Sequence, residues 1–121
     1  MRNTRSTRIF TTILAAFGVL AACAAVAMAA TITGGPGDDR LRGTAGDDTI
    51  SGLAGNDRVR AFAGNDMIIL GPGNDRATAG RGDDSVDAGE GDDAVGGGAG
   101  ADDITGGPGR DRLWGDRKSV V

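Results

Sequence analysis

The sequence predicts an all-β fold, a solenoid in which short parallel strands alternate with glycine-rich turns. Three observations predict it. Residues 34–114 divide without remainder into nine consecutive units of nine residues, the first reading GGPGDDRLR and the ninth GGPGRDRLW. In every unit the fourth residue is glycine, the sixth is aspartate and the eighth is apolar. A period repeated in this way, without an insertion, indicates a repeat architecture in which each unit packs on its neighbours.

Each unit divides into a turn and a strand. Positions 1–6 are rich in glycine, aspartate and asparagine, which accept tight turns and left-handed backbone angles. Positions 7–9 predict a three-residue strand in which position 8 points inward and positions 7 and 9 point outward. Two units then complete one coil, so odd and even units form two separate parallel sheets. The inward residues are Leu41, Ile50, Val59, Ile68, Ala77, Val86, Val95, Ile104 and Leu113.

The segment before the repeats predicts a signal helix for export. Met1–Arg8 carries three arginines and no acid, and a largely apolar run follows, ending in Ala27-Met28-Ala29. This order is typical of a secretory signal peptide, here residues 1–29, cleaved after Ala29. Two alternatives stay open. The run is long enough for a retained transmembrane anchor, and Leu20-Ala21-Ala22-Cys23 resembles a bacterial lipoprotein processing box with Cys23 as the lipidated residue.

The composition of the repeats predicts a fold that depends on a ligand. Residues 34–115 hold 16 acidic residues against eight arginines, a net charge of −8, and the chain has no histidine. Cys23 is the sole cysteine and leaves with the signal, so no disulfide can compensate for a thin core. Low hydrophobicity, high glycine content and strong net charge are typical of a chain that stays unfolded unaided. A bound ligand reconciles this composition with the strict period.

The chemistry of the unit indicates what the ligand is. Every coil stacks carboxylates and turn carbonyls over the identical groups of the coil below, and acids at that spacing repel one another unless a cation lies between them. Hard oxygen ligands without nitrogen or sulfur favour calcium over zinc or copper. Magnesium is less suited, because it requires strict octahedral geometry and keeps its waters. The sequence therefore predicts calcium as the ligand.

The unit resembles the RTX (repeats-in-toxin) nonapeptide, G-G-x-G-x-D-x-U-x, where U is a large apolar residue. The resemblance extends over residues 34–114. It implies a parallel β-roll in which calcium lies between the turns of adjacent coils on the same side. The ligands that it implies are the side chains of Asp39, Asp48, Asp57, Asp66, Asp75, Asp84, Asp93, Asp102 and Asp111 and the turn backbone at Gly37, Gly46, Gly55, Gly64, Gly73, Gly82, Gly91, Gly100 and Gly109. Five odd and four even turns would enclose at most about seven internal sites.

Departures from the pattern occur at three positions of the turn. Position 2 holds Thr44, Leu53 and Phe62 in units two to four. If the roll requires a positive φ there, these turns are expected to be strained or reshaped, with weaker calcium sites. Position 5 lacks an oxygen in the last two units, where Ala101 and Arg110 stand. Position 1 of units four to seven is not glycine but Ala61, Leu70, Ala79 and Ala88.

The outward positions 7 and 9 differ between odd and even units. Even units hold no basic residue there, whereas the odd units hold Arg40, Arg42, Arg58, Arg60, Arg76 and Arg112, with Trp114 at the end. If the odd units form one sheet, all six arginines lie on a single face. The simpler interpretation is a solvated face that offsets the acidic turns and prevents edge pairing. The alternative is a docking surface for an anionic polysaccharide, phosphate or an acidic cell-surface partner.

The chain is expected to have three parts: a signal peptide over residues 1–29, a calcium-binding roll over residues 30–115, and a tail over residues 116–121. The tail does not match the unit, and an artefact of sequence assembly would explain it. The expected function is that of a secreted bacterial calcium-binding protein that folds on the metal, has no catalytic activity and binds no nucleic acid. A membrane is involved only if Cys23 is lipidated, which gives a cell-surface lipoprotein. In the alternative, the chain is a fragment of a larger secreted adhesin, toxin or hydrolase and supplies its calcium-dependent repeats.

Overall fold

The computed structural model of the chain describes residues 27–115 and 119–120. The signal helix expected over residues 1–29 therefore falls almost entirely outside the described residues. Within the described part, every regular element is a β-strand, and no helix is long and apolar enough to cross a membrane. The strands are β1 (Thr31–Thr33), β2 (Arg40–Arg42), β3 (Thr49–Ser51), β4 (Arg58–Ala63), β5 (Met67–Ile69), β6 (Arg76–Arg81), β7 (Ser85–Asp87), β8 (Ala94–Ala99), β9 (Asp103–Thr105), β10 (Arg112–Trp114) and β11 (Ser119–Val120).

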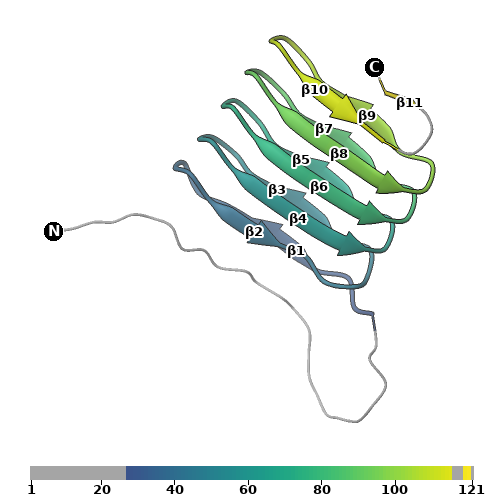
Figure 1. Ribbon diagram of the computed structural model, residues 1–121. Coiled ribbons are helices and arrows are strands. Elements are labelled where there is room, and N and C mark those ends of the chain that lie inside the picture. Colours follow the sequence, from purple (N-terminus) through teal and green to yellow (C-terminus); the bar gives the residue numbers. More distant parts are fainter. Residues whose placement is uncertain (1–26, 116–118, 121) are drawn as a thin grey trace, which may run out of the picture.

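The strands form two parallel sheets that face each other (Figure 1). One sheet has the order β1-β3-β5-β7-β9-β11, and the other has the order β2-β4-β6-β8-β10. Neighbouring strands from β1 to β10 pair in parallel with a constant offset of 18 residues, for example Leu41 with Val59 and Ile50 with Ile68. One coil is therefore two units. The predicted parallel β-solenoid, with odd and even units in separate sheets, is confirmed.

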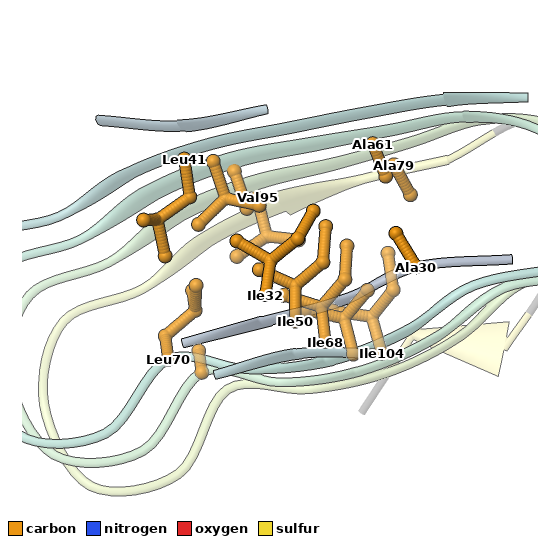
Figure 2. Packing of buried hydrophobic residues seen from close by; sticks show 14 residues of the cluster. Ala30, Ile32, Leu41, Ile50, Ala61, Ile68, Leu70, Ala79, Val95 and Ile104 are labelled. Carbon is orange, nitrogen blue, oxygen red and sulfur yellow. The ribbon is translucent and has the colours of Figure 1, made fainter. Parts of the chain in front are cut away.

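The core is a narrow stack of aliphatic side chains between the sheets. Position 8 supplies most of it, and Figure 2 shows Ile32, Ile50, Ile68 and Ile104 lying one behind another. Position 1 supplies the rest, because the non-glycine residues of units four to seven, Ala61, Leu70, Ala79 and Ala88, are fully buried. These four departures from the repeat thus extend the core. The other large apolar residues of the middle units are exposed, namely Leu53, Phe62, Met67 and Ile69.

The turns owe their glycines to close backbone approach between coils. Gly73, at position 4, has a φ of 138°, and a Cβ there would overlap the carbonyl oxygen of Gly55 one coil earlier. A side chain at this position would separate the coils. Position 2 takes a positive φ from unit three onward, including the non-glycine residues Leu53 (φ 76°) and Phe62 (φ 84°). The strain predicted at these two residues is confirmed.

Thr44 departs from the strained pattern, because its φ is not positive. Its main-chain N–H donates to Asp48 Oδ2 over 2.7 Å, and its hydroxyl oxygen lies 2.8 Å from Asp48 Oδ1. Gly35 in the first unit has the same arrangement, with its N–H donating to Asp39 Oδ2 over 2.6 Å. The first two turns therefore differ in conformation from those that follow.

The C-terminal segment contributes to a sheet. Ser119 and Val120 of β11 pair in parallel with Asp103 and Ile104 of β9. Part of the segment expected as a non-matching tail therefore continues the six-stranded sheet beyond β9. Residues 116–118 and 121 lie outside the described residues.

The contrast between Leu53 and Thr44 gives a test of the turn geometry. Leu53→Gly should raise the free energy of unfolding by about 1 kcal/mol. The substitution removes the left-handed strain, which costs an ordinary residue about 1–2 kcal/mol. The larger conformational entropy that glycine loses on folding cancels part of this stabilisation. Thr44→Gly should lower it by about 1–2 kcal/mol, because the hydroxyl contact with Asp48 is lost and no strain is relieved. Urea unfolding in saturating calcium measures both. Changes of the same sign would contradict the assigned turn conformations.

Candidate metal centre

The position-6 aspartates form two columns, one along each edge of the roll. Each aspartate directly precedes a strand, so the constant offset of the strands places it over the aspartate 18 residues away. Eight of the nine are buried, with at most 4% of the residue exposed, and Asp111 at the end is partly buried. The odd column consists of Asp39, Asp57, Asp75, Asp93 and Asp111, and the even column consists of Asp48, Asp66, Asp84 and Asp102. All nine predicted side-chain ligands thus lie in register.

One oxygen of each carboxylate is used by the fold itself. The main-chain N–H of a position-6 aspartate donates to Oδ1 of the position-6 aspartate in the next coil, as in Asp57 to Asp75 over 2.7 Å and Asp66 to Asp84 over 2.8 Å. In the even column the ladder begins at Ala30, whose N–H donates to Asp48 Oδ1 over 2.8 Å. The bond fixes each carboxylate and points it toward the preceding coil.

The other carboxylate oxygen is left without a partner in six turns. In the first two units, Oδ2 accepts the main-chain N–H of Gly35 or Thr44. In later units Oδ2 is buried and has no hydrogen-bond partner; these are the Oδ2 atoms of Asp57, Asp66, Asp75, Asp84, Asp93 and Asp102. A buried carboxylate oxygen without a partner is costly, by about 1–3 kcal/mol or more for a charged group. The six atoms therefore define positions that favour a cation.

Main-chain carbonyls approach the Oδ2 atoms of Asp39, Asp48 and Asp57 beside position 1. The first two of these atoms have an N–H partner, whereas Asp57 Oδ2 has none and lies, with the carbonyl oxygen of Leu70, beside the point that a Cβ on Gly52 would occupy. The point that a Cβ on Gly34 would occupy lies 2.6 Å from Asp39 Oδ2 and 2.8 Å from the carbonyl oxygen of Gly52 in the next coil. At Gly43 the corresponding atoms are Asp48 Oδ2, at 2.5 Å, and the carbonyl oxygen of Ala61, at 2.8 Å. A carboxylate and a turn carbonyl from successive coils thus converge beside position 1.

The position-1 carbonyls were not among the predicted site residues. The prediction placed the turn-backbone contribution at the position-4 glycines, whose carbonyls lie against position 4 of the next coil, as Gly55 does beneath Gly73. The sequence did hold a signal for this part of the site, namely glycine at position 1 in units one, two and three. The missing Cβ leaves space for a carboxylate oxygen at Gly34, Gly43 and Gly52.

Position 5 forms a second ladder that runs in the opposite direction. The N–H of Asn74 donates to Asn56 Oδ1, and the N–H of Asp92 donates to Asn74 Oδ1, each over 2.8 Å. The ladder needs only a side-chain oxygen, so aspartate and asparagine serve equally. Ala101 and Arg110 still donate their N–H groups to the preceding coil, over 2.9 Å each. A side-chain oxygen at Ala101 or Arg110 would accept an N–H from a coil beyond the ninth unit. Within the nine units, no hydrogen bond of this ladder is therefore lost.

Burial changes the acidity of the columns. The pKa of Asp57, Asp66, Asp75 and Asp84 rises to about 6 in each case, chiefly because burial removes water from the charged form. A main-chain hydrogen bond opposes the rise, and neighbouring carboxylates add to it. The pKa of Asp93 is raised for the same leading reason. Because the pKa in the fold exceeds its ordinary value, ionisation at neutral pH works against folding unless a cation compensates for it.

The donor set fits calcium. No three histidine, cysteine, aspartate or glutamate side chains gather at one point in the described part of the chain. A cation held beside a column must therefore also use main-chain carbonyls, and the donors are oxygen throughout. Calcium accepts six to eight such ligands in a flexible geometry, whereas zinc and copper prefer nitrogen and sulfur. The unpartnered Oδ2 atoms and the adjacent carbonyls meet these requirements.

Comparison with known families agrees with this chemistry. The family model of the RTX calcium-binding nonapeptide repeat matches the chain in four overlapping copies, at residues 33–68, 60–95, 69–104 and 96–117. The matched copies together extend over well more than half of the sequence and coincide with the two sheets. No curated protein and no solved structure matches the chain.

Proposed function

The chain belongs to the RTX calcium-binding nonapeptide repeat family and is a calcium-binding repeat protein, and we propose that calcium acts as the ligand that allows its roll to fold after export. The observation that carries this proposal is the set of six buried Oδ2 atoms without a hydrogen-bond partner. A bound calcium ion supplies the positive charge that compensates for these buried, unpartnered oxygens. Because the columns assemble only in the folded chain, the binding free energy becomes folding free energy.

The nine position-6 aspartates named above supply the side-chain ligands. From Asp57 to Asp102, Oδ1 holds each carboxylate in place through the ladder, and Oδ2 has no hydrogen-bond partner and is free to coordinate. At Asp39 and Asp48, calcium would replace the N–H of Gly35 or Thr44 at Oδ2. Main-chain carbonyls of the turns complete the coordination, including those at the position-4 glycines and, from the convergence at Gly34 and Gly43, those at position 1. At most about seven sites fit between successive turns on the two edges.

Export provides the calcium on which folding depends. In a cytoplasm low in calcium, the ionised columns oppose folding, and millimolar calcium outside the cell reverses this balance. The change in exposure at Ala30 supports cleavage after Ala29, because Ala27, Met28 and Ala29 are exposed while Ala30 is 4% exposed. Cleavage there removes the Met28 carbonyl, which accepts the Thr44 hydroxyl over 2.6 Å. The roll of residues 30–115 is then the mature unit.

A non-catalytic role follows from the use of its acids. Residues 30–121 contain no histidine or cysteine. The repeated aspartates at position 6 and the acids and amides at position 5 are taken up by the two ladders. These side chains therefore have a structural task in the roll, which supports a role without catalysis. We therefore assign the chain a binding and structural role.

Two adjacent aspartates test the ligand assignment. Asp84→Asn keeps an oxygen for the N–H of Asp66 but removes the charge at Oδ2, so we expect up to two fewer calcium ions bound and an increase of about tenfold in the calcium midpoint. Asp83→Asn removes one carboxylate at exposed position 5 and keeps an oxygen for the N–H of Ala101. It should leave the stoichiometry unchanged and the midpoint within about twofold.

Isothermal titration calorimetry of both variants measures stoichiometry and affinity together. Position 5 of unit four is already an amide, Asn65, so the roll accepts the side chain that Asp83→Asn introduces. Equal losses in the two variants would mean that overall charge, rather than the buried column, binds the metal, and would overturn the assignment.

The N-terminus of the exported protein gives a further test. We expect mass spectrometry of the secreted chain to find Ala30 as the first residue, with its new ammonium group beside the Asp48 carboxylate that its N–H already contacts. A chain that begins at Cys23 with an attached lipid would instead support the lipoprotein alternative. Recovery of the uncleaved chain in the membrane would refute cleavage after Ala29.

A further inference from the structure

The five-stranded sheet carries six arginines in two columns on its outward face. Its outward residues at position 7 are, in register, Arg40, Arg58, Arg76, Ala94 and Arg112. Its outward residues at position 9 are Arg42, Arg60, Thr78, Gly96 and Trp114. The six arginines and Trp114 are exposed. The parity prediction is therefore confirmed, and we call this surface the arginine face.

The arrangement of charge on the arginine face is unfavourable for the sheet itself. Neighbouring strands lie about 4.8 Å apart, and like charges placed directly opposite each other destabilise a sheet. Arg58 lies between Arg40 and Arg76 in the same column. In the groove beside the turns, the position-5 neighbours of Arg58 and Arg76 are neutral, namely Asn56 and Asn74. The groove also has carboxylates in its lining: Asp38 and Asp92 at position 5, and the buried Asp39, Asp57 and Asp75 at position 6.

The six-stranded sheet serves as an internal control. It has the same period, backbone and acidic turns, but the outward positions of β1, β3, β5, β7 and β9 hold no basic residue. If arginines served only to offset the turns or to protect sheet edges, both sheets would require them. Their restriction to one sheet indicates a partner with negative charge for that face.

Aromatic residues lie at the two ends of the arginine face, Phe62 at one and Trp114 at the other. The guanidinium carbons of Arg42 and Arg60 lie 5.6 and 5.8 Å from the centroid of the Phe62 ring. This is within the range of a cation–π interaction and restrains both side chains before any partner binds. At the other end, the indole of Trp114 lies across Gly96, with Nε1 2.6 Å from the point that a Cβ would occupy, and the residue is 54% exposed.

A shallow groove lies on the part of the arginine face that β2, β4 and β6 form. Its volume is about 420 Å³, and its lining includes Arg40, Arg42, Arg58, Arg60, Arg76 and Thr78. From β2 to β10 the face extends about 19 Å, which is four strand spacings. Guanidinium groups bind carboxylates and sulfates through paired hydrogen bonds. The face thus offers a row of anion sites that ends on a flat aromatic ring.

From this register we infer that the arginine face binds an acidic linear polysaccharide, with carboxylate or sulfate groups on the arginine columns and a sugar ring on Trp114. A linear chain with regularly spaced charges matches a row of regularly spaced guanidinium groups. A single-stranded nucleic acid would need several aromatic platforms for its bases, and the outward columns offer one exposed tryptophan. Because the columns exist only in the folded roll, the inference rests on the fold and not on which residues coordinate calcium.

The test measures binding of the calcium-loaded protein to chondroitin sulfate, which carries both groups, to hyaluronate, which carries carboxylates, and to neutral dextran. We expect the two acidic polymers to bind and to change the fluorescence of Trp114, the only tryptophan of the chain. Arg58→Gln should weaken binding by about fivefold, and R58Q/R76Q by more than about twentyfold. The matched control Arg81→Gln removes one exposed arginine outside the two columns and should change binding by less than about twofold.

Each variant is first compared with the parent protein by circular dichroism in calcium, so that a failure to fold is distinguished from a loss of binding. Equal weakening by Arg58→Gln and Arg81→Gln, or binding without a change in Trp114 fluorescence, would overturn the inference. It would also be overturned if neither acidic polymer binds, or if duplex DNA or anionic lipid vesicles bind at least as tightly as chondroitin sulfate.

Discussion

The structure depends on one constraint, the burial of a carboxylate in every coil along each edge of the roll. One oxygen of each carboxylate accepts a main-chain N–H from the neighbouring coil, as Asp75 does from Asp57, and so ties the coils together. The other oxygen is buried in six of the turns without any hydrogen-bond partner. The hydrogen-bond ladder and the need for a cation are therefore properties of the same side chain.

The thin core follows from this constraint. Each coil contributes only two position-8 side chains and, in the middle of the roll, an alanine or leucine at position 1, such as Ala79 or Leu70. Even position 8 holds an alanine, Ala77, in one of the nine units. A chain with so little apolar surface and so much glycine does not order itself through burial alone. In the proposed function, the columns supply the missing stabilisation once calcium neutralises their charge, and stability then depends on the calcium concentration.

Much of the fold could be predicted because the period fixes the register. The position of glycine, aspartate and one apolar residue in every unit determined the offset of 18 residues, the two sheets, the aspartate columns and the single arginine face. Details inside the turn could not be predicted, since they depend on the distance between coils. The inward side chain of Leu70, the carbonyl of Gly52 beside Asp39 and the opposite directions of the two ladders arise from that packing. Thr44 does not adopt the strained conformation, because its own side chain and N–H contact Asp48. A repeat pattern does not encode such a local contact.

Calcium-coupled folding is tested most directly by far-ultraviolet circular dichroism of the protein against free calcium. The titration runs from none to about 10 mM, which exceeds the affinity range of extracellular calcium modules. The same titration with magnesium is the control. The account predicts a cooperative gain of β-sheet signal with calcium and no comparable gain with magnesium, because the columns form only when a cation with flexible oxygen coordination neutralises them. A full β-sheet signal at neutral pH in the absence of calcium would contradict it, since the buried carboxylates would then be stable without a metal.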